Sequence, residues 1–240
     1  ERVIVSPIAG TTRDAIDTYI EMDGKKYLFI DTAGIRRKSK VYENIEKYSV
    51  IRAYASVEKA DVVLTVIDAT EGISEQDSKI AGLAHDAGKA SIVVVNKWDL
   101  IEKDNHSVKE YTKKIREELP FMQYCPILFV SALTSQRMGK IKETVDFIFD
   151  EASKRVATGV LNDVIGEAVM MNQPPSDKGK RLKIYYATQV GVRPPTFAIF
   201  VNEKELFHFS YQRYIENKLR ENFGYEGTPL KIYVREKNRK

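Results

Sequence analysis

The sequence predicts an α/β protein in which a doubly wound sheet is followed by a smaller α+β domain. In the first part, short Val/Ile/Leu runs alternate with amphipathic helical patterns, as in βαβ units around a parallel sheet covered on both faces. The order of elements then changes, and so does the charge. Residues 1–158 carry 24 Lys and Arg against 25 Asp and Glu, whereas residues 159–240 carry 14 against 9. The predicted domains are 1–157 and 158–240.

Each element of the first domain has a local signal. Asp23-Gly24 is a hairpin turn between two strands within "YIEMDGKKYLFID". The buried strands are expected in "DVVLTVID", "SIVVVNK" and "CPILFVSA". Helices are expected over 43–59, from Ser74 with Asp77 completing a capping box, over 107–119 and over 139–157.

The second domain begins with a helical pattern in "TGVLNDVIGEAVMMNQ" and a turn-rich loop, "PPSDKGK". Two strands, "RLKIYYATQV" and "TFAIFVNE", flank "GVRPP". A helix that ends at Gly224 precedes a last strand, "PLKIYVREK". This order predicts a small α+β domain.

The composition is that of a soluble globular protein, with 43% hydrophobic and 30% charged residues. No uncharged apolar run approaches the ~20 residues of a membrane-spanning helix. The single cysteine, Cys125, excludes an intrachain disulfide and is expected to pack in the core. We therefore expect a cytoplasmic protein without membrane contact.

Polar residues follow the predicted strands in four places: "AGTTRD" (9–14), "DTAG" (31–34), "NKWD" (96–99) and "SAL" (131–133). Each motif is weak alone. Asp99, for example, could simply cap the helix start that follows it. Their order and their common position at strand ends make the set specific, because ligands of such sheets bind at the carboxyl ends of the strands.

These motifs resemble those of the translation-factor-like GTPases. With the tail "ATQVGVRPPTFAIFVN", the whole chain is similar to the second GTPase domain and C-terminal KH-like domain of the Der (EngA) family of bacterial ribosome-assembly GTPases. The resemblance implies a P-loop-GTPase-like sheet, incomplete at its N-terminus, and a switch that binds and hydrolyses GTP in biogenesis of the large ribosomal subunit. It implies GTP or GDP, Mg²⁺ and K⁺ as cofactors. The implied partners are ribosomal RNA or a ribosomal subunit, and an upstream GTPase domain of the same protein.

The resemblance also assigns the guanine-binding residues. Asp99 would accept two hydrogen bonds from the base, which adenine cannot offer, so GTP is preferred over ATP. Asn96 would bond the base and tie neighbouring loops, and the aliphatic stem of Lys97 would cover the base face. Ser131 and Ala132 would offer backbone N–H groups to the guanine carbonyl. Trp98 and Leu133 complete the two motifs as candidate nucleotide-binding residues.

The residues that the resemblance assigns to the phosphates and Mg²⁺ lie in two switch segments. Thr12 would ligate Mg²⁺, and Asp31 would hold the same ion through water. The Gly34 N–H would contact the γ-phosphate, and Thr32 and Ala33 belong to the same segment. Ile35 stands where Ras-like GTPases carry a water-orienting glutamine, so the attacking water must be positioned by other groups. Thr12, Gly34 and Ile35 are the candidate catalytic positions.

No GxxxxGK[ST] phosphate loop occurs anywhere in the sequence. Without the backbone N–H groups and the lysine of that loop, the β- and γ-phosphates lose most of their stabilisation. We therefore expect a truncated piece of a longer GTPase, with activity of its own left open. The alternative is a module that binds RNA or protein regardless of nucleotide. An ATP-dependent enzyme is disfavoured by "NKWD".

The tail resembles a KH fold but lacks the GXXG loop with which KH domains clamp nucleic acid. Its basic residues could contact phosphates, or the domain could instead bind the GTPase domains: Lys180, Arg181, Lys183, Arg193, Arg213, Lys218, Arg220, Lys231 and Arg235. Its aromatic residues could stack bases, but their positions in strands favour core packing: Tyr185, Phe197, Phe200, Phe207 and Phe209.

Overall fold

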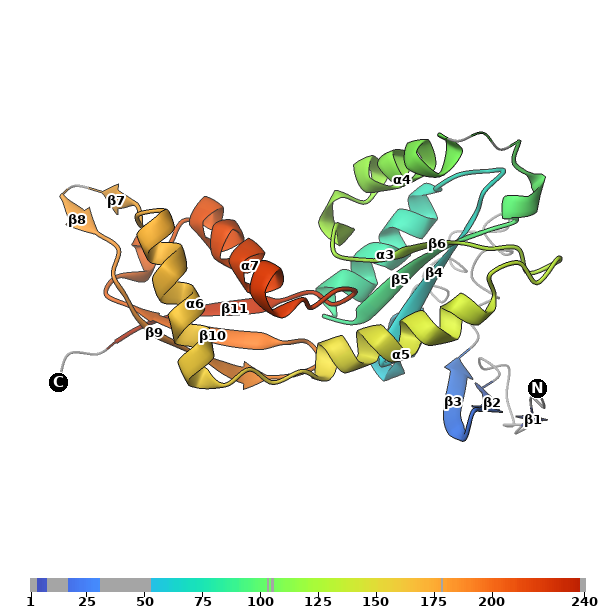
Figure 1. The fold of residues 1–240 in the computed structure, drawn as a ribbon, viewed down its shortest axis with the longest axis horizontal. Coiled ribbons are helices and arrows are strands. Elements are labelled where there is room, and N and C mark those ends of the chain that lie inside the picture. The colour runs from blue at the N-terminus through green and yellow to red at the C-terminus, as the bar shows by residue number, and fades with distance from the viewer. Residues whose placement is uncertain are drawn as a thin grey trace, which may run out of the picture. The chain divides into compact units, whose positions relative to one another are not determined.

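The structure is a computed structural model that describes residues 4–7, 17–30, 53–102, 104, 106–177 and 179–237. It divides into two compact units, residues 1–60 and 61–240, and each is described by itself (Figure 1). Among the described residues, no helix is long and apolar enough to cross a membrane.

The first unit contains an antiparallel sheet in the order β1-β2-β3, formed by Ile4–Pro7, Asp17–Met22 and Lys25–Ile30. The turn between β2 and β3 has positive φ at Asp23 (51°) and Gly24 (74°), which confirms the predicted hairpin. The strand β1 was not predicted. Of the helix expected over 43–59, residues 53–59 are helical and residues 43–52 lie outside the described part.

The second unit begins with a parallel sheet in the order β4-β5-β6. Its strands are β4 (Val62–Asp68), β5 (Ala90–Asn96) and β6 (Ile127–Phe129), at the three predicted positions. The last strand covers only Ile127–Phe129 of "CPILFVSA", and a 3₁₀ segment (Pro120–Met122) precedes it. Cys125 is buried as expected, and burial raises the pKa of its thiol to about 12.

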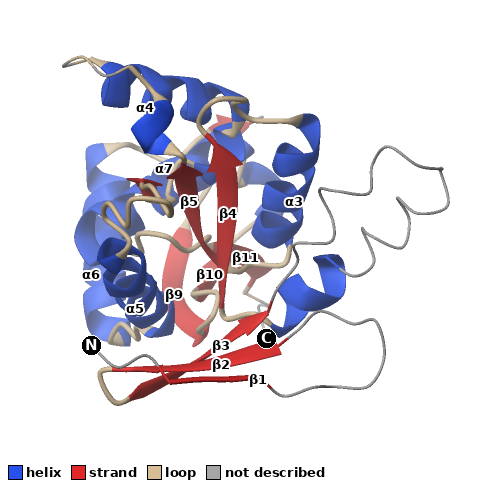
Figure 2. Ribbon diagram, turned by 90° about the vertical axis from the view of Figure 1, so that its right-hand side faces the viewer, coloured by secondary structure: helices blue, strands red, loops and turns tan. Residues whose placement is uncertain are grey.

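Helices cover both faces of this sheet, as a doubly wound arrangement requires (Figure 2). One face packs against α3 (Glu75–Asp86) and α4 (Ser107–Glu118), and the other against α5 (Gly139–Ser153). The capping box predicted at Ser74 is present, with the Ser74 hydroxyl accepting from the Asp77 N–H. Helix α5 ends four residues before the predicted position.

The remaining residues form the predicted small α+β domain. Helices α6 (Thr158–Met171) and α7 (Phe209–Phe223) pack on one face of a sheet in the order β11-β10-β9 (Figure 1). Its strands are β9 (Ile184–Gly191), β10 (Thr196–Val201) and β11 (Lys231–Glu236), with β9 antiparallel and β11 parallel to β10. The segment expected to be only a loop contains two paired short strands, β7 (Ser176–Asp177) and β8 (Lys180–Arg181). A 3₁₀ segment (Lys204–Leu206) precedes α7.

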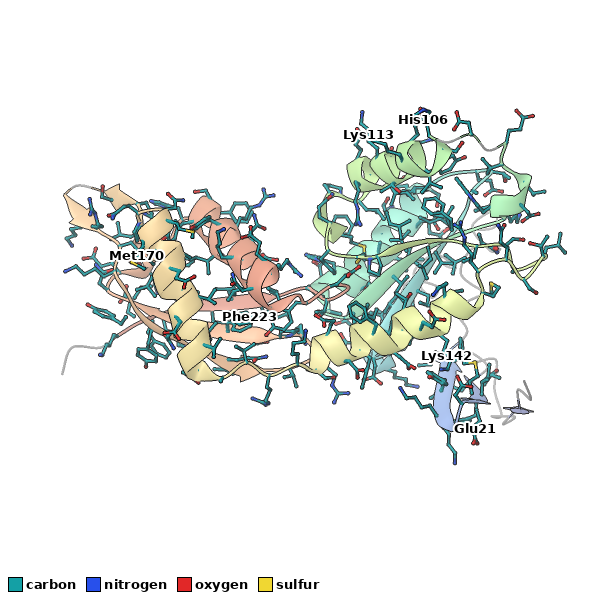
Figure 3. The ribbon with its side chains drawn as sticks, viewed as in Figure 1. Glu21, His106, Lys113, Lys142, Met170 and Phe223 are labelled. Atoms are coloured by element: carbon teal, nitrogen blue, oxygen red, sulfur yellow. The ribbon has the colours of Figure 1, made fainter. Side chains whose placement is uncertain are left out.

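The α/β and α+β parts of the second unit meet along a polar seam, formed by Tyr124, Ile148, Glu151, Arg220, Tyr225 and Gly227. The buried Glu151 carboxylate accepts from the Tyr225 N–H (2.6 Å) and pairs with Lys154. Phe223 is the last residue of α7 (Figure 3). Its carbonyl accepts a further hydrogen bond from the Lys154 amine. The Gly227 N–H donates to the Tyr124 carbonyl (2.8 Å). The seam therefore joins the two parts through backbone groups as well as side chains.

Candidate nucleotide-binding site

The carboxyl ends of β4, β5 and β6 lie at one edge of the parallel sheet. Asp68 ends β4 directly opposite Asn96, the last residue of β5. The backbone fixes the loops that follow, because the Trp98 N–H donates to the Val130 carbonyl (3.0 Å) and the Ala69 N–H to the Asn96 carbonyl (2.9 Å). The "NKWD" and "SAL" motifs are thus brought together.

The Lys97 side chain is anchored by a carboxylate that the sequence analysis missed. Lys97 adopts a left-handed backbone conformation (φ 61°, ψ 31°), and its amine pairs with the buried Asp68. This hydrogen bond lowers the Asp68 pKa to about 2, although burial opposes the shift, and Thr70 contributes two further hydrogen bonds. The signal was available, since "DVVLTVID" closes an apolar strand with a carboxylate. The contact fixes the direction of the Lys97 stem.

Trp98 contributes to the core and not to the surface of the site. Its ring is buried against the edge of Tyr111, with centroids 5.0 Å apart, and against Phe129 at 4.5 Å. The Tyr111 hydroxyl in turn donates to the Ala69 carbonyl (2.9 Å). Trp98 therefore secures the loop between two strand ends, and its predicted contact with a ligand stays a prediction.

Asp99 lies in a single 3₁₀ turn, Trp98–Leu100. Its Oδ1 atom is buried and has no hydrogen-bond partner among the described residues. A buried carboxylate oxygen without a donor is costly, and proteins rarely retain one without a reason. The atom is an acceptor for which the described chain supplies no donor, as expected of a group that receives a ligand.

The segment after β6 completes the edge. The Asn96 side-chain oxygen accepts from the Ala132 N–H (3.0 Å), which is the loop tie that the sequence analysis expected. The Ser131 N–H donates to the Gln136 carbonyl (3.1 Å), and the Ser131 hydroxyl accepts from the Thr134 N–H. Both N–H groups assigned to the guanine carbonyl thus have partners within the chain. A ligand oxygen would have to share or displace these bonds. The Leu133 side chain is 86% exposed beside them.

The phosphate-side residues lie outside the described residues: Thr12, Asp31, Thr32, Ala33, Gly34 and Ile35. Their predicted roles, including Mg²⁺ ligation by Thr12 and Asp31, stay predictions. Within the part of the chain that the structure describes, no group of three His, Cys, Asp or Glu residues could hold a metal ion.

The described site offers polar groups that could bind a heterocyclic base. An unpartnered carboxylate oxygen can accept from ring and amino N–H groups, and the amide of Asn96 lies nearby across the same strand ends. Guanine carries adjacent N1 and N2 donors, so the donor and acceptor pattern fits this base. Adenine offers a different pattern at that position.

Two family descriptions match the chain. Residues 1–97 match "50S ribosome-binding GTPase", and residues 155–235 match "KH-domain-like of EngA bacterial GTPase enzymes, C-terminal". Among solved structures, Era of Aquifex aeolicus aligns over 97% of this chain and 85% of its own, at a TM-score of 0.47 and 23% identity, a likeness too weak to carry an argument.

Curated relatives are much more similar. The protein named GTPase Der of Alkaliphilus metalliredigens is 64% identical over 237 residues, which is 99% of this chain and 54% of that protein. GTPase Der of Ruminiclostridium cellulolyticum is 63% identical over 238 residues, again 99% of this chain and 54% of its own length. The chain thus spans about half the length of these relatives. It belongs to the Der (EngA) family of GTPases, as a GTPase-type α/β sheet followed by the family's KH-like domain.

Proposed function

We propose that this chain is part of a switch protein that binds and hydrolyses GTP during biogenesis of the large ribosomal subunit. The observation that carries the nucleotide assignment is the buried, unpartnered Oδ1 of Asp99. It lies in a loop that Trp98 secures to the core and that follows the Asn96–Ala132 tie. Family membership supports the reaction, GTP to GDP and phosphate, in the intact protein.

In this proposal the protein recognises the guanine base before GTP is hydrolysed. The Asp99 carboxylate receives the N1 and N2 donors of guanine, while the Asp68 pair holds the Lys97 stem along the base face. Thr12 and Asp31 hold Mg²⁺, which supplies charge stabilisation to the phosphates when bound. Gly34 offers its N–H to the γ-phosphate. K⁺ is a further proposed cofactor, and the water-positioning group is one other than Ile35.

The proposed partners follow from the charge of the tail and from the family. Residues 159–240 carry 14 basic against 9 acidic residues, which suits ribosomal RNA or a ribosomal subunit. The family description "50S ribosome-binding GTPase" supports this partner class. An upstream GTPase domain is the proposed intramolecular partner, and the cytoplasm is the proposed location.

The test compares guanosine, adenosine and xanthosine nucleotides on two proteins. These are the chain itself and a version extended at its N-terminus by the corresponding segment of a Der relative. The extended form is expected to bind GDP and GTP, with no competition by ATP. Asp99→Asn should weaken guanine binding roughly hundredfold or more, because the amide nitrogen cannot accept the base donors. The Asp99→Asn variant should bind xanthosine nucleotides better than the parent protein does, since xanthine carries an acceptor where guanine carries its amine.

Failure of the extended protein to bind any guanine nucleotide would leave the second function, a module that binds RNA or protein regardless of nucleotide. The observation in its favour is the basic charge of residues 159–240, with 14 Lys and Arg against 9 Asp and Glu. Binding of ribosomal particles that is equal with GTP, with GDP and without nucleotide would establish that alternative.

A further inference from the structure

The β9–β10–β11 sheet has one face that no helix of its domain covers. Helices α6 and α7 pack on the opposite face (Figure 1). Phe197, Ile199 and Val201 of β10 are buried on that face. Side chains alternate along a strand, so their neighbours Ala198 and Phe200 point to the other side. We call that side the outer face, with these positions: 186, 188, 190, 196, 198, 200, 231, 233 and 235.

Aromatic rings gather on this outer face. Tyr186 and Phe200 are register partners whose rings stack at 4.3 Å with only 13° between their planes. A register shift between Phe200 and Val201 adds Tyr185, which is 43% exposed. Tyr233 on β11 is 52% exposed, beside Ala198. Of the five aromatic residues expected in the core, Phe197 and Phe207 are buried, but Tyr185 and Phe209 are exposed. That expectation was wrong for these two residues.

The charge around these rings is positive. Arg235 is the register partner of Phe200, and the Lys237 amine lies 5.3 Å from the centre of the Tyr185 ring. None of the outer-face positions carries Asp or Glu. Several other basic residues of the tail are engaged elsewhere, in the pairs Lys180–Glu203, Lys218–Glu221 and Arg220–Glu216. On the outer face, by contrast, Arg235 and Lys237 lie beside the rings of Phe200 and Tyr185.

We infer that the outer face binds single-stranded RNA, by stacking of bases on Tyr186, Phe200 and Tyr233 and by contact of Arg235 and Lys237 with phosphates. Exposed aromatic residues in a sheet, flanked by cations, are the groups with which other sheet proteins hold single-stranded RNA. A protein partner would also use aromatic and Arg anchors, but the absence of carboxylates favours a polyanion. The outer face would thus be the surface that binds the RNA partner of the proposed function. Only the choice of RNA as the ligand rests on that proposed function.

The test is binding of a fluorescent single-stranded RNA of about 12 nucleotides to the whole chain, followed by anisotropy. The first variant is Tyr186→Leu with Tyr233→Leu, which removes two rings and keeps apolar side chains. The matched control is Phe209→Leu, because Phe209 is 72% exposed and lies 5.8 Å from the Arg213 guanidinium, but on α7 and not on the sheet. A third variant, Arg235→Gln, removes one charge and no ring.

Each lost ring should weaken binding roughly fivefold to hundredfold, with the salt dependence unchanged. Arg235→Gln should reduce the slope of log affinity against log salt by about 0.7. The control should bind like the parent chain. Photocrosslinking with 4-thiouridine RNA should label peptides from β9, β10 or β11.

Equal binding by the double variant and the control would overturn the inference, as would crosslinks confined to other surfaces. A double variant that keeps RNA binding but loses affinity for the upstream domain would show a protein-docking face instead. If no variant and not even the parent chain binds RNA, the inference fails. Guanine-nucleotide binding, measured separately with Asp99→Asn, still decides the proposed function.

Discussion

The strand-end site and the seam both bury charged groups, but they satisfy them differently. In the seam, the buried Glu151 carboxylate accepts from the Tyr225 N–H with one oxygen and from Lys154 with the other. At the strand ends, Asp68 is equally well partnered, whereas Asp99 Oδ1 has no donor within the described part of the chain. The difference supports the proposal that Asp99 receives a ligand, whereas Asp68 and Glu151 stabilise the fold.

The seam also contains a buried group without a partner, the Tyr225 hydroxyl. Burial raises the Tyr225 pKa to about 12, so the group is neutral at physiological pH. Burying a neutral hydroxyl without a hydrogen bond costs about 1–3 kcal/mol, and a carboxylate costs more. A missing partner is therefore informative about function mainly where the group is charged.

Gly227→Ala should produce the largest loss of stability, because it adds a side-chain atom inside the seam. A Cβ there would overlap Cγ2 and Cβ of Ile148, at a φ of +73°. Left-handed strain and overpacking together predict a loss of about 3–5 kcal/mol in the free energy of unfolding. Gly179→Ala is the matched control, with φ +79° and no heavy atom within 4 Å of its Cβ. Urea unfolding of both variants is the measurement, and equal losses would show that the seam is not tightly packed.

Glu151→Ala should cost less, about 2–3 kcal/mol, because it leaves the buried Tyr225 N–H without an acceptor. Lys154 also loses its ion pair, although its exposed amine can turn to solvent. Thermal or urea unfolding measures the loss. Glu143→Ala, which removes an exposed i,i+3 partner of Lys140, provides the comparison and should change stability by less than about 0.5 kcal/mol. A Glu151 effect as small as that would contradict a structural role for the buried carboxylate.

Local signals made most of the second unit predictable. Unbroken Val/Ile runs located β4 and β5, and Ser74 with Asp77 located the start of α3, because burial and capping act over a few residues. The "NKWD" motif likewise placed Asp99 and Asn96 at a strand end.

Contacts between distant residues could not be predicted in this way. The Asp68–Lys97 pair joins two strands, and the Asn96–Ala132 tie spans 36 positions. The outer face depends on which side of a three-stranded sheet the helices cover, so alternation alone could not separate Tyr185 from Phe197. Trp98 lies within a binding motif, yet its ring packs in the core against Tyr111 and Phe129.

Asp68 should contribute stability that depends on pH. Its pKa of about 2 in the folded chain is below the ordinary value of 3.8. The contribution is therefore fully present above the ordinary value and is lost as the pH falls through about 2. Asp68→Asn should destabilise the chain by about 1–2 kcal/mol near neutral pH. The difference should shrink between pH 4 and pH 2, as followed by urea unfolding at several pH values. A difference that is independent of pH would mean that the ion pair with Lys97 does not form.

Asp99→Asn should have the smallest effect on the free energy of unfolding. The sign of that effect distinguishes Asp99 from Glu151. Because Oδ1 has no donor among the described residues, replacing the carboxylate with a neutral amide removes a charge whose buried oxygen is unsatisfied and breaks no hydrogen bond of that atom. The free energy of unfolding should stay within about 0.5 kcal/mol of the parent or rise, while guanine affinity in the extended protein falls. A loss above about 1 kcal/mol would place Asp99 with Glu151 among the structural carboxylates. The absence of a stability cost, together with a loss of binding, is the result that only a ligand-receiving carboxylate explains.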